Sequence, residues 1–199
     1  MSKPVVQTRA QITGRFLDAA ERLLAGSGHE SLSTRSVAAE AGLNHSLVHY
    51  YFGSVEGLLL AVAERAGERM LERDEIVFAA AGPFVERWRA AMAAMERDLE
   101  DGRARVQAEL EAAARNRPRL RDALTAVDGR RRRVLTVAFS EAASEYQLGQ
   151  WLVEPMVALA STFGRGMRDE RLLGLEVGHQ ALLRWFDGML VSLQETPAP

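Results

Sequence analysis

Apolar residues recur along this chain at the three- and four-residue spacing of amphipathic helices, and alternating strand-like runs are scarce. In the first such segment, Thr8 and Gln11 have the spacing of a capping box, and an apolar stripe follows over residues 12–24. The sequence Gly-Ser-Gly at residues 26–28 favours the end of a helix. The pattern therefore predicts a first helix between these two signals.

Three further helices are predicted before residue 73. Ser33 is a candidate cap for a short helix that runs to about Ala41. A tight turn over residues 42–44 separates this helix from a third one, which ends near Phe52. Ser54 is a candidate cap for the fourth.

The second part of the chain has the same helical periodicity. Pro83 and Pro118 favour the first turns of new helices, where a missing N–H group costs no hydrogen bond. Helices are predicted at about residues 83–99, 103–116, 118–146, 152–167 and 175–193. The expected fold class is all-α.

Residues 34–52 have the pattern of two short helices that cross over a tight turn. Ala38 is small enough for close contact between them, and Gly42 suits the positive φ that the turn requires. The positions of a small shared core are apolar, and the outer positions of the second helix are polar or amphipathic. This pattern is typical of a helix-turn-helix, which presents its second helix to the major groove of double-stranded DNA.

Candidate DNA contacts lie where these two helices begin and along the second helix. The positive N-terminus at Ser33 and Thr34 suits a phosphate, and we expect these residues to cap the helix as well. The segment 44–46 is the candidate for reading base edges, and the two tyrosines contact phosphate or pack against neighbouring helices. The full candidate set is Ser33, Thr34, Arg35, Asn44, His45, Ser46, His49, Tyr50 and Tyr51.

Residues from about Phe16 to Leu60 resemble the DNA-binding domain of the tetracycline-repressor (TetR) family. Two positions depart from the family pattern. His49 stands where a tyrosine is usual, although it can still donate to a phosphate, and Val55 replaces a lysine that contacts phosphate in the family. The matching residues are Ala19-Ala20, Gly28, Ser33, Val37-Ala38, Ala41-Gly42-Leu43, Tyr50-Tyr51-Phe52, Ser54, Glu56 and Leu58-Leu59.

The resemblance implies an N-terminal three-helix DNA-binding domain at residues 1–54 and a C-terminal helical ligand-binding and dimerisation domain at residues 55–199. It further implies a homodimeric, ligand-responsive repressor of a palindromic operator, with activation as the alternative. The last two helices would then form the dimer interface, although an internal core would give the same apolar stripes. Candidates for this interface are Met156, Leu159, Phe163, Val177, Ala181, Leu182, Trp185, Phe186, Met189 and Leu193.

A small-molecule effector of unknown identity is expected between the middle helices. Aromatic and methionine side chains there would suit a hydrophobic or amphipathic molecule, and each of them could equally be core. The candidates for lining its pocket are Trp88, Met92, Met95, Phe139, Tyr146, Trp151 and Phe163.

Charge and composition modify this interpretation only slightly. The chain has 199 residues and a net charge of −2, and its first 56 residues are neutral, so the basic footprint usual for DNA binding is missing. The basic run 130–133 favours a solvated face, with a site for an anion or for the phosphates of an acyl thioester as the alternative. The absence of cysteine, signal-peptide pattern and membrane-length apolar segment leads us to expect a cytoplasmic protein without membrane contact.

Two other functional classes are less well supported by the sequence. Motifs of nucleotide-binding, metallopeptidase and serine-hydrolase enzymes are missing, so neither an enzyme nor a cofactor is expected. His45 and His49 have metal-ligand spacing on a helix, but no cysteine accompanies them, and no metal site is expected. A helical adaptor with a vestigial helix-turn-helix is the remaining alternative, and Val55 together with the neutral N-terminal segment favours it.

Overall fold

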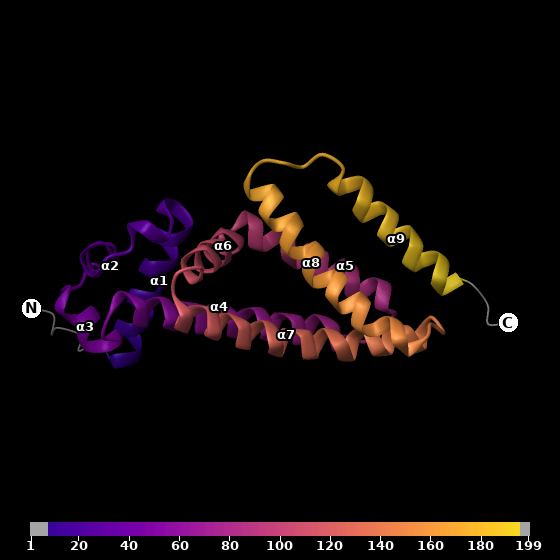
Figure 1. Cartoon of the computed structure of the whole chain (residues 1–199), viewed down its shortest axis with the longest axis horizontal. Coiled ribbons are helices and arrows are strands. Elements are labelled where there is room, and N and C mark those ends of the chain that lie inside the picture. Colours follow the sequence, from indigo (N-terminus) through magenta and orange to yellow (C-terminus); the bar gives the residue numbers. More distant parts are fainter. Residues whose placement is uncertain (1–7, 196–199) are drawn as a thin grey trace, which may run out of the picture. The chain divides into compact units, whose positions relative to one another are not determined.

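The structure, a computed structural model, describes residues 8–195. Within this range it contains nine α-helices, two short 3₁₀ turns and no strand, which confirms the all-α prediction (Figure 1). The chain divides into two compact units. Unit 1 comprises the described residues up to Gly67 and Arg105–Thr125, and unit 2 comprises Glu68–Ala104 and the described residues from Ala126 onward.

Unit 1 contains the predicted helix-turn-helix. The predicted caps are confirmed: Thr8 and Gln11 form a capping box, Ser33 accepts from the N–H of Ser36, and Ser54 Oγ accepts from the N–H of Gly57 at 3.0 Å. A 3₁₀ turn at His29–Ser31 joins the first two helices. The α-helices are α1 (Arg9–Ser27), α2 (Thr34–Ala41), α3 (Ser46–Phe52), the first part of α4 (Val55–Phe78), most of α6 (Arg103–Ala114) and the start of α7 (Pro118–Glu145).

One hydrophobic core holds unit 1 together. Phe16 of α1 and Val48 of α3 are fully buried in it, as are Leu58 and Leu59 of α4. Helices from later in the chain complete this core through Val106, Leu110, Ala113, Ala114 and Leu120. The compact unit around the helix-turn-helix therefore does not end at the predicted boundary after residue 54, because α6 and the start of α7 share its core.

Unit 2 contains the remainder of α4 and α7 together with α5 (Phe84–Glu100), α8 (Val153–Leu172) and α9 (His179–Glu195). Its core is built around Phe84, Trp88, Phe139 and Tyr146. Ion pairs join α7 to α4, and a stacked ring pair with centroids 5.5 Å apart, Trp88 and Phe186, joins α5 to α9.

In the part of the chain that the structure describes, no single helix has the length and apolar composition of a membrane span. The pair α3 and α4 meets those criteria only when taken together, across a bend of 60°.

Candidate functional site

The turn between α2 and α3 is fixed from both sides. Gly42 adopts the left-handed conformation (φ 64°, ψ 38°), which a glycine enters without the cost that other residues incur. Its N–H group and that of Leu43 donate to carbonyls in the last turn of α2. From α1, Arg15 Nη2 donates to the carbonyl oxygen of Ala41 at 2.6 Å and to that of Gly42 at 3.3 Å. The orientation of α3 therefore depends on an arginine that the sequence did not single out.

The N-terminus of α3 is capped by Asn44 from two residues before the helix. Asn44 Oδ1 accepts from both the backbone N–H and the hydroxyl of Ser46, each at 2.9 Å. Because Oδ1 is occupied in this way, the amide Nδ2 of Asn44 is the group that remains to donate to a base. His45, which precedes the helix, is exposed.

Most of the predicted DNA contacts lie together on exposed positions of unit 1. Tyr50 is 72% exposed, whereas Thr34 and Tyr51 are half-buried. The ring of Tyr51 lies 6.4 Å from that of Phe16, and the guanidinium of Arg9 lies 5.6 Å above it. Tyr51 therefore packs against α1, in line with one of its two predicted roles. The exposed candidates are Ser33, Arg35, Asn44, His45, Ser46, His49 and Tyr50.

The ring of His49 is anchored at the end of its own helix. Its Nδ1 lies 3.1 Å from the carbonyl oxygen of Gly53. Because a carbonyl oxygen only accepts hydrogen bonds, Nδ1 must carry the proton, and a neutral ring then has an unprotonated Nε2. The predicted donation from His49 to a phosphate therefore requires the charged ring.

The junction between α3 and α4 depends on a residue that sequence reasoning missed. A Cβ atom built on Gly57, in the first turn of α4, would lie 2.0 Å from the carbonyl oxygen of Phe52, the last residue of α3. Any residue other than glycine would collide there. A glycine inside the first turn of a predicted helix was the available signal.

Helix α6 binds the end of α1 in unit 1 through polar contacts. Glu109 Oε2 accepts from the backbone N–H of His29 at 2.8 Å and lies 2.6 Å from its ring Nδ1. One turn earlier, Arg105 donates to the carbonyl oxygen of Ala25 at 3.2 Å. Although desolvation would raise it, the hydrogen bonds from His29 hold the pKa of Glu109 below its usual range. No local sequence pattern indicates this contact, because its partners are 80 residues apart.

The predicted effector-contacting residues of unit 2 are only partly brought together. Trp88, Phe139 and Tyr146 are buried in one core, and Met92 packs against it. Phe163 reaches the same region through Phe186, whose ring stacks on both Phe163 and Trp88. Met95 is half-buried, and Trp151 is 77% exposed, with its indole against Gly149.

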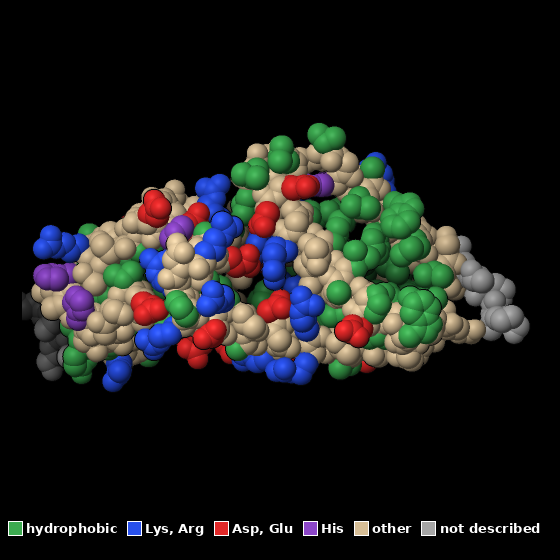
Figure 2. Space-filling model, viewed as in Figure 1, with side chains coloured by type: hydrophobic (Ala, Val, Ile, Leu, Met, Phe, Trp, Pro, Cys, Tyr) green, Lys and Arg blue, Asp and Glu red, His purple; other side chains and the backbone are tan. Residues whose placement is uncertain are grey.

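The predicted dimer face has both exposed and half-buried members. Leu159, Val177, Leu182 and Trp185 are exposed, as is Ala181, and Figure 2 shows hydrophobic side chains gathered over the α8–α9 region. The half-buried members contact the core of unit 2 or neighbouring rings: Met156, Phe163, Phe186, Met189 and Leu193.

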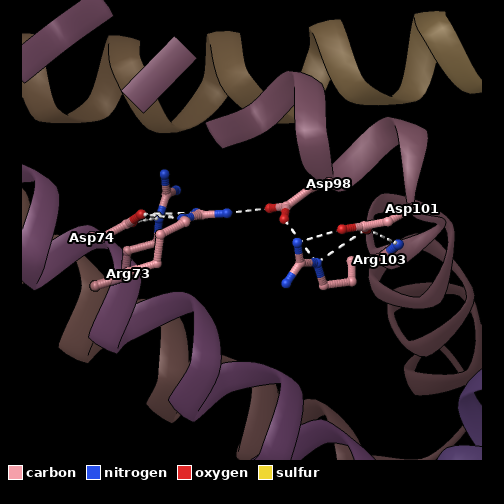
Figure 3. Close-up of polar contacts among 6 residues, drawn as sticks. Arg73, Asp74, Asp98, Asp101 and Arg103 are labelled. Atoms are coloured by element: carbon pink, nitrogen blue, oxygen red, sulfur yellow. Dashed lines mark hydrogen bonds and ion pairs between the residues drawn. The ribbon is translucent and has the colours of Figure 1, made fainter. Parts of the chain in front are cut away.

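A network of alternating charges joins four helices within unit 2. Asp74 of α4 is only 4% exposed; it accepts from Arg131 of α7 at 2.8 Å and from its neighbour Arg73. Figure 3 shows Arg73 extending from Asp74 to Asp98 of α5, and Arg103, the first residue of α6, between Asp98 and Asp101. We call these six residues the charge network.

Two of the other three arginines of the run 130–133 also have carboxylate partners close by. Arg130 lies 2.7 Å from Glu68 and Arg132 lies 2.7 Å from Asp128, whereas Arg133 is exposed. The described residues contain no group of three or more His, Cys, Asp or Glu placed to hold a metal ion.

Comparison with known proteins gives a family match confined to the N-terminal part of the chain. Residues 16–62 match the family model of the bacterial regulatory proteins of the tetR family. An HTH-type transcriptional regulator from the dhlA 5′ region of Xanthobacter autotrophicus is 44% identical over 59 residues, which are 30% of this chain and 29% of that protein. This match therefore spans less than a third of the curated relative.

Solved structures show the same fold over nearly the whole chain. The fatty acid degradation regulator FadR from Bacillus halodurans has a TM-score of 0.75 at 17% identity and covers 97% of this chain and 100% of its own. The transcriptional regulator FadR from Bacillus subtilis, in complex with stearoyl-CoA, has a TM-score of 0.67 at 19% identity and covers 93% and 99%. At these identities the likeness is one of fold.

Proposed function

The chain belongs to the tetR family of bacterial regulatory proteins, and we propose that it is a cytoplasmic, ligand-responsive repressor that binds a palindromic operator as a homodimer. Its family and relatives are regulators of transcription rather than enzymes. The observation that carries the proposal is the fixed recognition segment 44–50, which is held by Arg15, Gly42 and the Asn44 cap and whose polar side chains are exposed.

This segment has the chemistry that reading of bases requires. Donors and acceptors on Asn44, His45 and Ser46 lie at the start of α3, and the N-terminal residues of a recognition helix are those that contact base edges. The capped N-terminus of α2, with Arg35 in its first turn, supplies a seat for a backbone phosphate. Base reading is thus assigned to the start of α3, and the start of α2 supplies one phosphate anchor.

A homodimer would cover the exposed apolar side chains of α8 and α9. In the single chain Trp185 is 61% exposed and Leu159 is 54% exposed, which is unusual for a continuous apolar face that contacts only water. A symmetric pair of chains also supplies two recognition helices, which bind half-sites about 34–36 Å apart in a palindrome. One seven-residue helix alone contacts too few bases to specify a site.

The effector is proposed to bind among the aromatic side chains of unit 2 and to be hydrophobic or amphipathic. Trp88, Phe139 and Tyr146 offer apolar surface there. The stearoyl-CoA complex of the structurally similar FadR supports this class of ligand.

Coupling between effector and operator is proposed to run through the helices that both units share. Helices α4, α6 and α7 each contribute residues to both units, and each supplies at least one member of the charge network that links them to α5. A ligand that favours one arrangement of these helices over another would change the spacing of the recognition helices. Only a difference in affinity for the two arrangements can produce this shift.

The test is selection of binding sites by the full chain from a random duplex pool, followed by a salt titration of the selected duplex. We compare the wild type with the double variant Asn44→Ala, His45→Ala and with Arg133→Ala, an exposed arginine of unit 2 as control. The proposal predicts enrichment of a palindrome, a steep loss of affinity with salt, and loss of binding in the double variant only. A folded dimer that enriches no duplex, with or without acyl-CoA, would instead favour the adaptor.

A further inference from the structure

We propose that His49 binds the DNA backbone only as an imidazolium, so that operator binding takes up a proton at this residue in each protomer. The proposal rests on the proposed function as a DNA-binding regulator. It adds a protonation step and a pH dependence to that function.

The anchoring of the ring determines which nitrogen is free. His49 and Gly53 are joined twice: the N–H of Gly53 donates to the carbonyl of His49 at 2.9 Å, and Nδ1 of the ring donates to the carbonyl of Gly53 at 3.1 Å. These two bonds hold the ring against the end of α3 and place the proton on Nδ1. The exposed side chain then offers Nε2 alone to a ligand.

The protonation state determines what Nε2 can bind. In the neutral ring Nε2 is an acceptor, and a phosphate oxygen, which is also an acceptor, cannot bond to it. In the imidazolium Nε2 carries a proton and donates a charge-assisted hydrogen bond, which is stronger than a neutral one. A phosphate at this position therefore selects the charged ring.

Two features favour phosphate over a base as the partner of His49. His49 lies in the last turn of α3, whereas base reading is expected from residues at the start of the helix. The C-terminal end of a helix is also its negative end, which stabilises a cation such as the imidazolium. A neutral His49 ring that accepts a hydrogen bond from the amino group of a base would gain nothing from the negative end of the helix, and it would lie away from the residues expected to read bases.

The charged groups of the neighbouring elements have other partners. Arg9 of α1 lies over the ring of Tyr51, and Arg15 donates to the carbonyls at the end of α2. Glu56 of α4 lies 3.9 Å from Arg119. His45, one turn earlier, is the nearest other titratable group on the same helix face. The incoming phosphate is therefore the anion expected to stabilise the charged form.

The sign of the pH dependence follows from linkage. DNA favours the protonated ring, so the gain in affinity from this contact is greatest at low pH and is lost as the pH rises and the ring gives up its proton. Between pH 6 and pH 8 we expect operator affinity to fall by roughly five- to tenfold per protomer. The effect is squared when both protomers of a dimer contact the operator.

The first experiment measures operator affinity from pH 5.5 to 8.5 at constant ionic strength, together with proton uptake by calorimetry in two buffers of different ionisation enthalpy. His49→Gln should bind with almost no dependence on pH and without proton uptake. His45→Gln is the matched control: it should weaken binding at every pH but keep the slope. A wild type without a slope, a slope that persists in His49→Gln, or one that vanishes in His45→Gln overturns the proposal.

The second experiment needs no DNA. The ¹⁵N chemical shifts of the imidazole nitrogens of His49 at pH 8 report which nitrogen is protonated, and the proposal requires the Nδ1–H form. A ring protonated on Nε2 overturns the proposal whatever the binding data show. A folded protein that binds no duplex at any pH contradicts the proposed function instead, and the ring measurement separates the two failures.

Discussion

Replacing Gly57 by alanine should displace the recognition helix, because no space exists for the added methyl group. Its Cβ would lie 2.0 Å from the carbonyl oxygen of Phe52, whereas ordinary contacts begin at 3.4 Å, so the end of α3 must retreat by roughly 1.4 Å. Neither atom is the end of a flexible side chain that could rotate away. The strain therefore falls on the backbone at the junction of α3 and α4.

The expected effects on stability and on binding both follow from this displacement. Forcing an extra methyl group into a packed site costs about 1–3 kcal/mol of unfolding free energy. A shift of this size also exceeds the tolerance of about 0.5 Å for a preorganised binding site. Loss of one well-aligned base contact costs about 1–3 kcal/mol, so operator affinity should fall roughly five- to 150-fold per half-site.

Urea unfolding followed by circular dichroism, and operator binding followed by fluorescence anisotropy, measure the two effects separately. Gly14→Ala is the matched control, since Gly14 lies inside α1 of the same unit and its Cβ would meet no atom within 4 Å. It should stabilise the protein by about 0.5–1 kcal/mol and leave operator affinity unchanged. If Gly57→Ala unfolds at the wild-type midpoint and binds as the wild type does, the close approach at this junction is refuted.

Three further substitutions test other parts of the structure. Trp185→Glu places a charge on the proposed dimer face and should yield monomers in analytical ultracentrifugation; a variant that stays dimeric would contradict the assigned interface. Asp98→Asn breaks the link between Arg73 and Arg103 and should accelerate amide hydrogen exchange in α6 several-fold. The control is Asp187→Asn, which removes an ion pair between α5 and α9. Equal acceleration of exchange in α6 by this control would refute the idea that the charge network stabilises α6. The pKa of Glu109 is held below its usual range in the folded protein. The stabilisation that Glu109 provides is therefore complete above the pKa of a glutamate in the unfolded chain, and it is lost as the pH falls from there through the lower pKa of the folded state. Glu109→Gln should therefore flatten the acid limb of the thermal stability profile, and an unchanged limb would show that the contact with His29 contributes nothing.

Local sequence patterns are sufficient to predict the helices and the helix-turn-helix of this protein. These features are local: Thr8 and Gln11, Ser33 and Ser54 satisfy N–H groups within three residues of themselves, and apolar periodicity marks the buried face of each helix. Gly42 fixed the turn for the same reason, since its backbone conformation depends on the residue itself. The similarity to a known family is carried by this same local pattern.

Contacts between distant parts of the chain establish how these helices are supported and which side-chain atoms remain available for binding. Glu109 meets His29 across 80 residues, and α6 and α7 complete the core that holds the recognition helix. The collision at Gly57 and the proton on Nδ1 of His49 likewise depend on where carbonyl groups of other residues point. Periodicity and caps report what a residue does within its own helix, but contacts between distant segments are set by packing in three dimensions, which a single sequence does not display.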